Sequence, residues 1–117
     1  MRAIRIHEFG GPEAMKLEEV PTPKPADDQA LVRIEAAGVN FIDVYQRTGL
    51  YKNPLPYGLG LEGAGVVEAV GGGVTTVRVG DRVAWTGIPG SYATHNVVPA
   101  DKLVTLPAGV DTGAIAP

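Results

Sequence analysis

The sequence predicts a mainly β protein, a small barrel or sandwich of short strands that carries one brief helix. Short runs of alternating apolar and polar residues recur along the chain, and this alternation is typical of half-buried strands. Sixteen glycines and ten prolines among 117 residues supply turn signals between those runs, as in barrels and sandwiches. Residues 38–51 depart from this pattern because they carry the start and stop signals of a helix.

Three strands are expected before the helix, at Met1–His7, Met15–Val20 and Ala30–Ala37. In the second strand, Met15 and Leu17 should occupy the buried face, since alternate side chains of a strand point the same way. Prolines at positions 21, 23 and 25 follow that strand. Because proline has no N–H to donate, they indicate a connection that lies outside any sheet.

The helix is expected from Asn40 to Gly49. Asn40 is a favourable N-cap residue, and Asp43 stands at the spacing of a capping box, with its charge at the positive end of the helix dipole. Gly49 suits the left-handed conformation that ends many helices. Two of the four tyrosines, Tyr45 and Tyr51, lie in the same stretch, which is consistent with a binding surface and equally with an ordinary surface helix.

After the helix, we expect an irregular loop over residues 51–60 and then four more strands. These strands are expected at Glu62–Val70, Arg82–Thr86, Ser91–Val98 and Asp101–Leu106. Between the first two, the apolar segment Val74–Val79 leads to a turn at Gly80–Asp81. Glycine-containing turns separate most of these strands, including the triple glycine at 71–73. The last ten residues, 108–117, are expected to begin a connection or a helix.

Composition disfavours several classes of function. A chain of 117 residues corresponds to about one domain. Its net charge of −3 and pI near 5.3 argue against a nucleic-acid partner. The absence of cysteine excludes disulfides and thiolate metal sites and fits a cytoplasmic protein. We expect no membrane association, since the sequence has neither a signal-peptide core nor an apolar run of about 18 residues.

Two local patterns suggest chemistry that the surrounding sequence does not support. The run GLGLEG at Gly58–Gly63 is a literal G-x-G-x-x-G, but a dinucleotide fingerprint needs a preceding strand and a helix that opens at the third glycine. Prolines precede this run and a strand-like segment follows it. The only histidines, His7 and His95, lie far apart on expected strands, whereas zinc needs three or four close ligands. We therefore predict no metal site.

Several separated motifs occur in the order that one enzyme superfamily has. They stand at Ala37–Val39, Gly60, Glu62–Gly65, Gly71–Gly73 and Gly80–Val83. With the run NFIDVY at Asn40–Tyr45, the chain resembles the catalytic, GroES-like domain of the medium-chain dehydrogenase/reductase superfamily. Within it, the chain looks like the zinc-free NADPH:quinone oxidoreductase (zeta-crystallin-like) branch. The resemblance implies a GroES-like, partly open β-barrel with one or two short helices.

Zinc-dependent members of this superfamily have a cysteine and a histidine where this chain has Asn40 and Leu61. Asparagine and leucine cannot replace a thiolate and an imidazole on zinc. The resemblance therefore implies a zinc-independent hydride transfer from NADPH to a quinone or another small planar carbonyl compound.

The same resemblance implies the site residues. The cofactor-binding residues would be Asn40, Phe41, Ile42, Asp43, Val44 and Tyr45. The catalytic residues would be Tyr45 and Tyr51, stacked on or hydrogen-bonded to the quinone, although ordinary aromatic packing would also explain these tyrosines. Glu62 is expected to make a structural hydrogen bond. When full length, such an enzyme is expected to be a homodimer.

Members of the superfamily carry a larger nucleotide-binding domain after this one. We therefore expect residues 1–117 to form the GroES-like catalytic domain without the C-terminal Rossmann domain, and to be inactive alone. Two alternatives stay open at this point. One is a GroES-like binding or co-chaperone module without redox activity, and the other is a zinc-free reductase of enals or enoyl thioesters.

Overall fold

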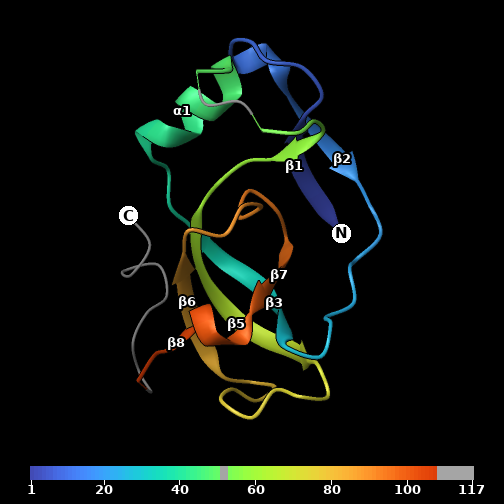
Figure 1. Cartoon of the computed structure of the whole chain (residues 1–117), viewed down its shortest axis with the longest axis vertical. Coiled ribbons are helices and arrows are strands. Elements are labelled where there is room, and N and C mark those ends of the chain that lie inside the picture. The colour runs from blue at the N-terminus through green and yellow to red at the C-terminus, as the bar shows by residue number, and fades with distance from the viewer. Residues whose placement is uncertain (51–52, 108–117) are drawn as a thin grey trace.

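The computed structural model describes residues 1–50 and 53–107, which form two antiparallel sheets and one α-helix (Figure 1). The smaller sheet has the order β2–β1–β4, built from Met15–Glu19, Arg2–Ile6 and Tyr57–Gly58. The larger sheet has the order β7–β3–β5–β6–β8, built from His95–Pro99, Gln29–Ala37, Glu62–Val70, Arg82–Thr86 and Val104–Thr105. Helix α1 covers Phe41–Thr48, and two 3₁₀ turns cover Pro12–Ala14 and Ala100–Lys102. The predicted mainly β, partly open architecture is confirmed.

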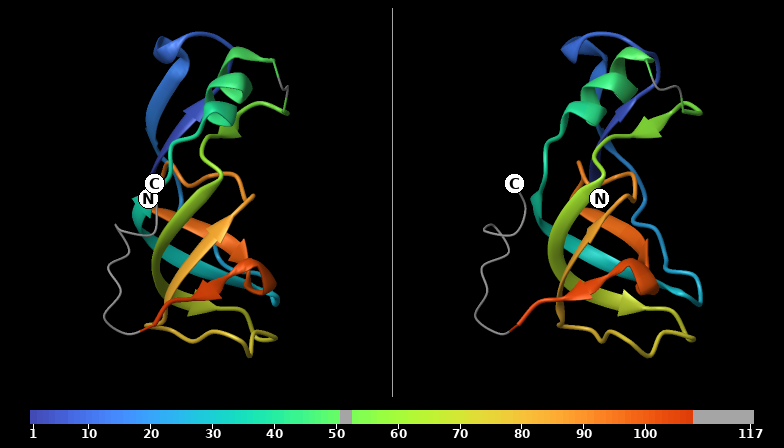
Figure 2. Two further views of the ribbon diagram at one scale, coloured as in Figure 1. Left: turned by 90° about the vertical axis from the view of Figure 1, so that its left-hand side faces the viewer. Right: turned by 60° about the vertical axis from the view of Figure 1, so that its left-hand side comes forward.

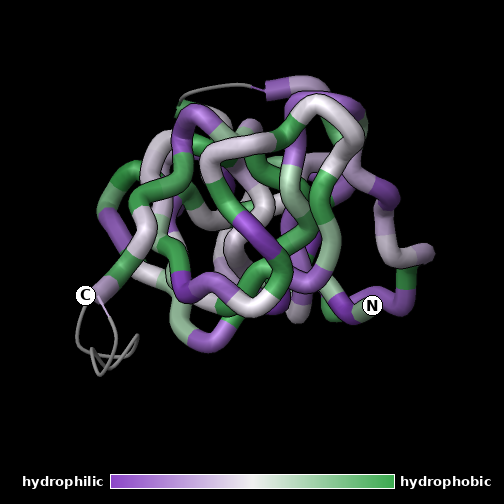
Figure 3. The backbone as a smooth tube through the Cα atoms, turned by 90° about the horizontal axis from the view of Figure 1, so that it is seen from below, coloured by the Kyte–Doolittle hydropathy of each residue, from purple (hydrophilic) through white to green (hydrophobic). Residues whose placement is uncertain are grey.

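The larger sheet carries the main apolar core. Its fully buried valines come from four strands and pack with Trp85; they are Val32, Val67, Val83 and Val98. Apolar and polar residues alternate along the chain in Figure 3, as the two faces of a strand require. Register shifts in the β3–β5 pairing bend these long strands, and Figure 2 shows the resulting curvature of the sheet.

Residues 92–94 join the two sheets. The Ile4 N–H donates to the Tyr92 carbonyl oxygen (2.8 Å), and the Thr94 N–H donates to the carbonyl oxygen of Arg2 (2.9 Å). On the other side, the Thr94 carbonyl oxygen accepts the Ile34 N–H from β3 (2.9 Å). The segment is therefore fixed to the smaller and the larger sheet at once.

The apolar segment Val74–Val79 forms no strand. The segment is irregular and lies between turns at residues 72–73 and 79–80. At its two ends, the Val74 N–H donates to the Gly71 carbonyl oxygen and the Gly80 N–H donates to the Val67 carbonyl oxygen. Both edges of the adjacent β5 are already paired, with β3 and β6, so no free ladder is available there. Val77 is buried in the core, while Val79 is exposed.

Other boundaries differ from the prediction for similar reasons. The strand expected at Ser91–Val98 becomes a regular ladder only at β7, because its first residues cross between the sheets. The strand expected at Asp101–Leu106 shrinks to β8, since a 3₁₀ turn takes up its beginning. Leu17, expected to be buried, is 67% exposed on the edge strand β2. The short pairing of β4 with β1 was not predicted.

Candidate functional site: the α1 wall

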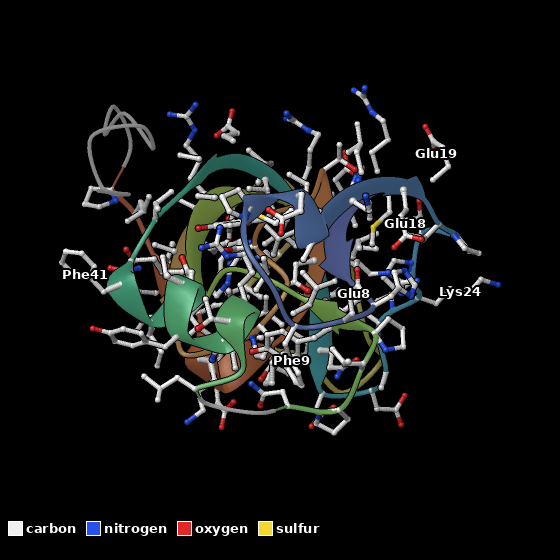
Figure 4. All side chains as sticks on the ribbon, turned by 90° about the horizontal axis from the view of Figure 1, so that it is seen from above. Glu8, Phe9, Glu18, Glu19, Lys24 and Phe41 are labelled. Atoms are coloured by element: carbon white, nitrogen blue, oxygen red, sulfur yellow. The ribbon has the colours of Figure 1, made fainter. Side chains whose placement is uncertain are left out.

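Helix α1 is inverted relative to an ordinary surface helix. Its buried residues are polar: Asp43, which is only 4% exposed, and Gln46. Residues advance by about 100° around a helix axis, so Asp43 and Gln46 share one face and positions 41 and 45 lie opposite. All of the exposed residues of α1 except Thr48 are apolar or aromatic, namely Phe41, Ile42, Val44 and Tyr45. Figure 4 shows the ring of Phe41, which is 82% exposed, pointing away from the body of the molecule.

The local sequence explains where α1 begins and ends. Asn40 is the N-cap in an extended conformation, and the predicted capping box with Asp43 is present. The Asp43 carboxylate accepts the backbone N–H of Asn40 at Oδ2 (3.0 Å), and the Asp43 N–H donates to the Asn40 carbonyl oxygen (3.0 Å). Gly49 ends the helix with φ 89°, in the left-handed region that glycine adopts without strain.

Tyr92 holds the buried face of α1. Its hydroxyl donates to Asp43 Oδ2 over 2.6 Å, so this oxygen accepts from both Tyr92 and the Asn40 N–H. Burial, the hydrogen bond to Asp43 and the charge of that carboxylate, in this order, raise the pKa of the Tyr92 hydroxyl. Each of these effects disfavours a phenolate beside the carboxylate. At neutral pH the hydroxyl therefore stays protonated and acts as a donor.

A second side chain holds Asn40, the N-cap of the helix. Asn40 Nδ2 donates to Glu62 Oε1, at the start of β5, over 3.2 Å. Gly38 makes this approach possible, because a Cβ at that position would overlap the Glu62 carboxylate. The hydrogen-bonding role predicted for Glu62 is confirmed. Asn40 thus has its backbone fixed by Asp43 and its side chain fixed by Glu62.

A groove of about 360 Å³ lies beside these contacts, between α1 and the smaller sheet. Its lining is largely apolar and consists of Ile4, Met15, Val39, Asp43, Val44, Arg47, Leu59 and Tyr92. Asp43 Oδ1 and Arg47 Nε are buried there without a hydrogen-bond partner among the described residues. The groove suits an apolar group whose orientation a few polar atoms can set.

The structure brings most of the predicted site residues together. Positions 40–45 occupy the N-cap and first turns of α1, with the side chains of Phe41 and Tyr45 outward and that of Asp43 inward. Tyr51 lies outside the described residues. Sequence reasoning missed Tyr92, because no local pattern links it to Asp43, which is 49 positions away.

Other candidate motifs form no site. Residues 58–63 run from β4 into β5 without an intervening helix, so this run lacks the helix N-terminus that a dinucleotide fingerprint needs. The two histidines lie in separate ion-pair clusters, His7 with Glu18 and His95 with Glu68. Over residues 1–50 and 53–107, no three carboxylate or histidine groups are placed to hold a metal ion. None of the helices in this part of the chain is long and apolar enough to span a bilayer.

Comparison with known proteins links this geometry to one family. The family model described as the alcohol dehydrogenase GroES-like domain matches residues 26–108. A quinone oxidoreductase of Pseudomonas aeruginosa is 48% identical over 112 residues, which are 94% of this chain and 34% of the relative. The chain thus spans about a third of the length of the curated relatives that it matches.

Solved structures of oxidoreductases share the fold of this chain. The Escherichia coli quinone oxidoreductase, determined in complex with NADPH, superposes with a TM-score of 0.93 at 41% identity. The superposition covers 96% of this chain and 35% of the E. coli chain. A 2-haloacrylate reductase is 40% identical with a TM-score of 0.87, and covers 99% of this chain and 35% of its own.

Proposed function

The chain belongs to the family of alcohol dehydrogenase GroES-like domains, and on that premise we propose that it is the catalytic domain of a zinc-independent NADPH:quinone oxidoreductase. The observation that carries this proposal is the outward apolar face of α1, called the α1 wall here and formed by Phe41, Ile42, Val44 and Tyr45. It belongs to a chain that is 48% identical to a quinone oxidoreductase. An enzyme of this class transfers a hydride from the reduced nicotinamide to the acceptor, and the cofactor supplies that chemistry.

The residues of α1 fit a nicotinamide end of such a cofactor. A flat, largely apolar ring needs an apolar surface, and the exposed side chains of Phe41 and Val44 provide one. We propose that positions 40–45 hold the ring, with Asn40 at the helix start and Tyr45 at the far end. Asp43 acts indirectly in this proposal, because its buried carboxylate accepts hydrogen bonds from the Asn40 N–H and the Tyr92 hydroxyl.

Tyr45 and Tyr51 are the proposed partners of the acceptor. A tyrosine combines an aromatic face for stacking with a hydroxyl that can donate to a quinone oxygen. A donor placed where negative charge develops stabilises the transition state of the transfer. Tyr45 lies on the same outward face as Phe41, which supports a shared role beside the ring.

The proposed independence from zinc rests on residue identity. Asn40 and Leu61 stand where zinc-dependent relatives carry metal ligands. The side-chain N–H of Asn40 already donates a hydrogen bond to Glu62, and the alkyl side chain of Leu61 offers no lone pair to a metal.

The proposed enzyme includes a second domain. Because the chain spans about a third of its relatives' length, we propose that a nucleotide-binding domain accompanies residues 1–117 and holds the cofactor's phosphates. A homodimer in the cytoplasm remains our prediction for that two-domain protein.

A second candidate substrate class has one specific observation in its favour. The likeness to a 2-haloacrylate reductase favours an enzyme that delivers the hydride to a carbon–carbon double bond conjugated with a carbonyl group. The α1 wall could position the nicotinamide for either acceptor, so the substrate pocket alone would distinguish them.

The test uses a two-domain form, in which this chain is joined to the part of the P. aeruginosa relative beyond the matched region. We expect NADPH oxidation that depends on 1,4-benzoquinone and is unchanged by EDTA. The matched assays replace the quinone with 2-chloroacrylate or with an enal. Faster turnover of these acceptors would support the second class, and a requirement for added zinc would contradict the argument from Asn40 and Leu61.

A further inference from the structure

We propose that Tyr92 is a positioning residue that sets the orientation of α1, and with it the place of Asn40 and Phe41 against the nicotinamide. Tyr92 acts through Asp43 and does not touch the cofactor. This inference rests on the proposed function, and it adds a residue that the sequence and the comparisons leave without a role.

The way α1 is held makes such a residue necessary. Most surface helices are fixed by an apolar face packed on the core, but the inward side chains of α1 are those of Asp43 and Gln46. Apolar packing is non-directional, whereas a hydrogen bond fixes distance and angle. The angle of this helix therefore depends on polar contacts. The Gly10 N–H donates to the Arg47 carbonyl oxygen (2.9 Å) near its end, and the shortest contact, the 2.6 Å bond from Tyr92 to Asp43, holds its beginning.

Tyr92 is itself well anchored. Its N–H donates to the Leu59 carbonyl (3.0 Å), and its carbonyl oxygen accepts the Ile4 N–H (2.8 Å). Its ring packs against the second apolar cluster, which is formed by Ile6, Ala14 and Leu59. Gly60, with φ +92°, leaves room for this ring, because a Cβ there would lie 2.6 Å from Tyr92 Cδ1. The hydroxyl thus starts from a position that the framework fixes.

The hydrogen bond from Tyr92 to Asp43 is linked to the proposed cofactor-binding residues through the single carboxylate of Asp43. Asp43 Oδ2 accepts from the Tyr92 hydroxyl and from the Asn40 N–H, so a shift of this carboxylate moves the first residue of the wall. Glu62 fixes the side chain of Asn40 from β5. Two anchors from different parts of the chain, Tyr92 in the segment between the sheets and Glu62 in β5, thereby determine where Asn40 lies. A Tyr92 hydroxyl committed to Asp43 is not the donor to an acceptor oxygen, which separates its role from that proposed for Tyr45.

The first test measures backbone hydrogen exchange in this chain with Tyr92→Phe, which keeps the ring and removes the hydroxyl. We expect the amides of Asn40 and Asp43 to exchange at least about tenfold faster, because local opening of the helix start becomes easier. The matched control is Val83→Ala in the main core, which lowers global stability and does not touch α1. Equal acceleration at these two amides in both variants would overturn the proposal.

The second test measures kinetics in the two-domain form. Tyr92→Phe should lower kcat for the quinone by about tenfold and change the dissociation constant of NADPH by less than about threefold, because misplacement slows transfer more than binding. The deuterium isotope effect on kcat with 4-deuterated NADPH should rise, since transfer becomes rate-limiting. A smaller folded fraction would leave that isotope effect unchanged, and so should Val83→Ala.

The two proposals fail separately. If the unmodified two-domain form reduces no acceptor with NADPH, the proposed function is wrong, and the inference loses its bearing on the cofactor. Local acceleration in the exchange experiment would still assign Tyr92 the anchoring of α1. If the form is active and Tyr92→Phe leaves both kcat and the isotope effect unchanged, the positioning role is wrong and the proposed function stands.

Discussion

The five-stranded sheet and helix α1 are stabilised in opposite ways. The sheet turns valines and Trp85 inward and carries ion pairs, such as Arg33 with Glu68, on its outer face. Helix α1 turns Asp43 inward and leaves Phe41 exposed. The first arrangement maximises buried apolar area, which is the main favourable term in folding. The second arrangement leaves apolar side chains exposed over about two helical turns, so it does not gain the free energy of burying them.

This difference separates residues that stabilise the domain from residues that are available for binding. An exposed apolar surface has no value for the folding of the domain, so it indicates a surface that meets another group. Because the polar anchors of α1 are directional, they hold the apolar wall in one orientation without burying it.

Removing the large side chain of Trp85, which is buried, should have the largest effect on stability. Trp85→Ala leaves a cavity beside Val83 and Val67, and a buried Trp-to-Ala change costs about 3–5 kcal/mol. Urea unfolding followed by circular dichroism measures the loss. A loss below about 1 kcal/mol would show that the larger sheet is not held by its apolar core.

Asp43→Ala should destabilise by about 1–3 kcal/mol, since it leaves the Tyr92 hydroxyl and the Asn40 N–H without their common acceptor. The same urea unfolding measures it. Asp43→Asn is the matched control and should lose less, because an amide oxygen can still accept both bonds. Equal losses would mean that the charge of the carboxylate matters more than its hydrogen bonds.

Phe41→Ser should change the free energy of unfolding by less than about 0.5 kcal/mol, because the ring is 82% exposed. In the two-domain form it should weaken NADPH binding by about tenfold, the worth of one buried apolar side chain. Fluorescence titration with NADPH measures this. Val104→Ala, on an exposed residue of β8, should alter neither quantity. A strong loss of stability in Phe41→Ser would break the distinction between the two regions.

The smallest effect concerns alkaline pH. The pKa of Tyr92 is raised above its ordinary value of 10.0, so above pH 10 the unfolded chain loses this proton before the folded chain does. The contribution of Tyr92 to the free energy of unfolding is therefore fully present below pH 10, and it falls as the pH rises toward the pKa of the folded state. Urea midpoints at pH 8 and at pH 10.5 should show a smaller alkaline decrease in Tyr92→Phe than in the unmodified chain. An identical decrease in both would remove Tyr92 from this part of the pH profile.

Elements with local signals were predictable from the sequence. The helix expected from Asn40 to Gly49 is observed with these residues as its caps. It was predictable because each cap depends only on residues within about one turn of its own end of the helix. The strand at Arg82–Thr86 was predicted with its observed bounds, since its turn-forming neighbours are close in sequence.

Features that depend on distant partners were not predictable. Val74–Val79 has the composition of a strand but no free edge to pair with. Leu17 has the right parity for burial, yet it lies on an edge strand that nothing in the described structure covers. The contact of Tyr92 with Asp43 arises only because residues 92–94 cross from one sheet to the other.

The central claim is that the outward face of α1 meets the nicotinamide. It is tested most directly by nuclear Overhauser effects between bound NADPH and selectively labelled side chains in the two-domain form. We predict cross-peaks from the nicotinamide H4 to the rings of Phe41 and Tyr45, and none to Trp85 in the core. Bound NADPH without any cross-peak to α1 would contradict the claim.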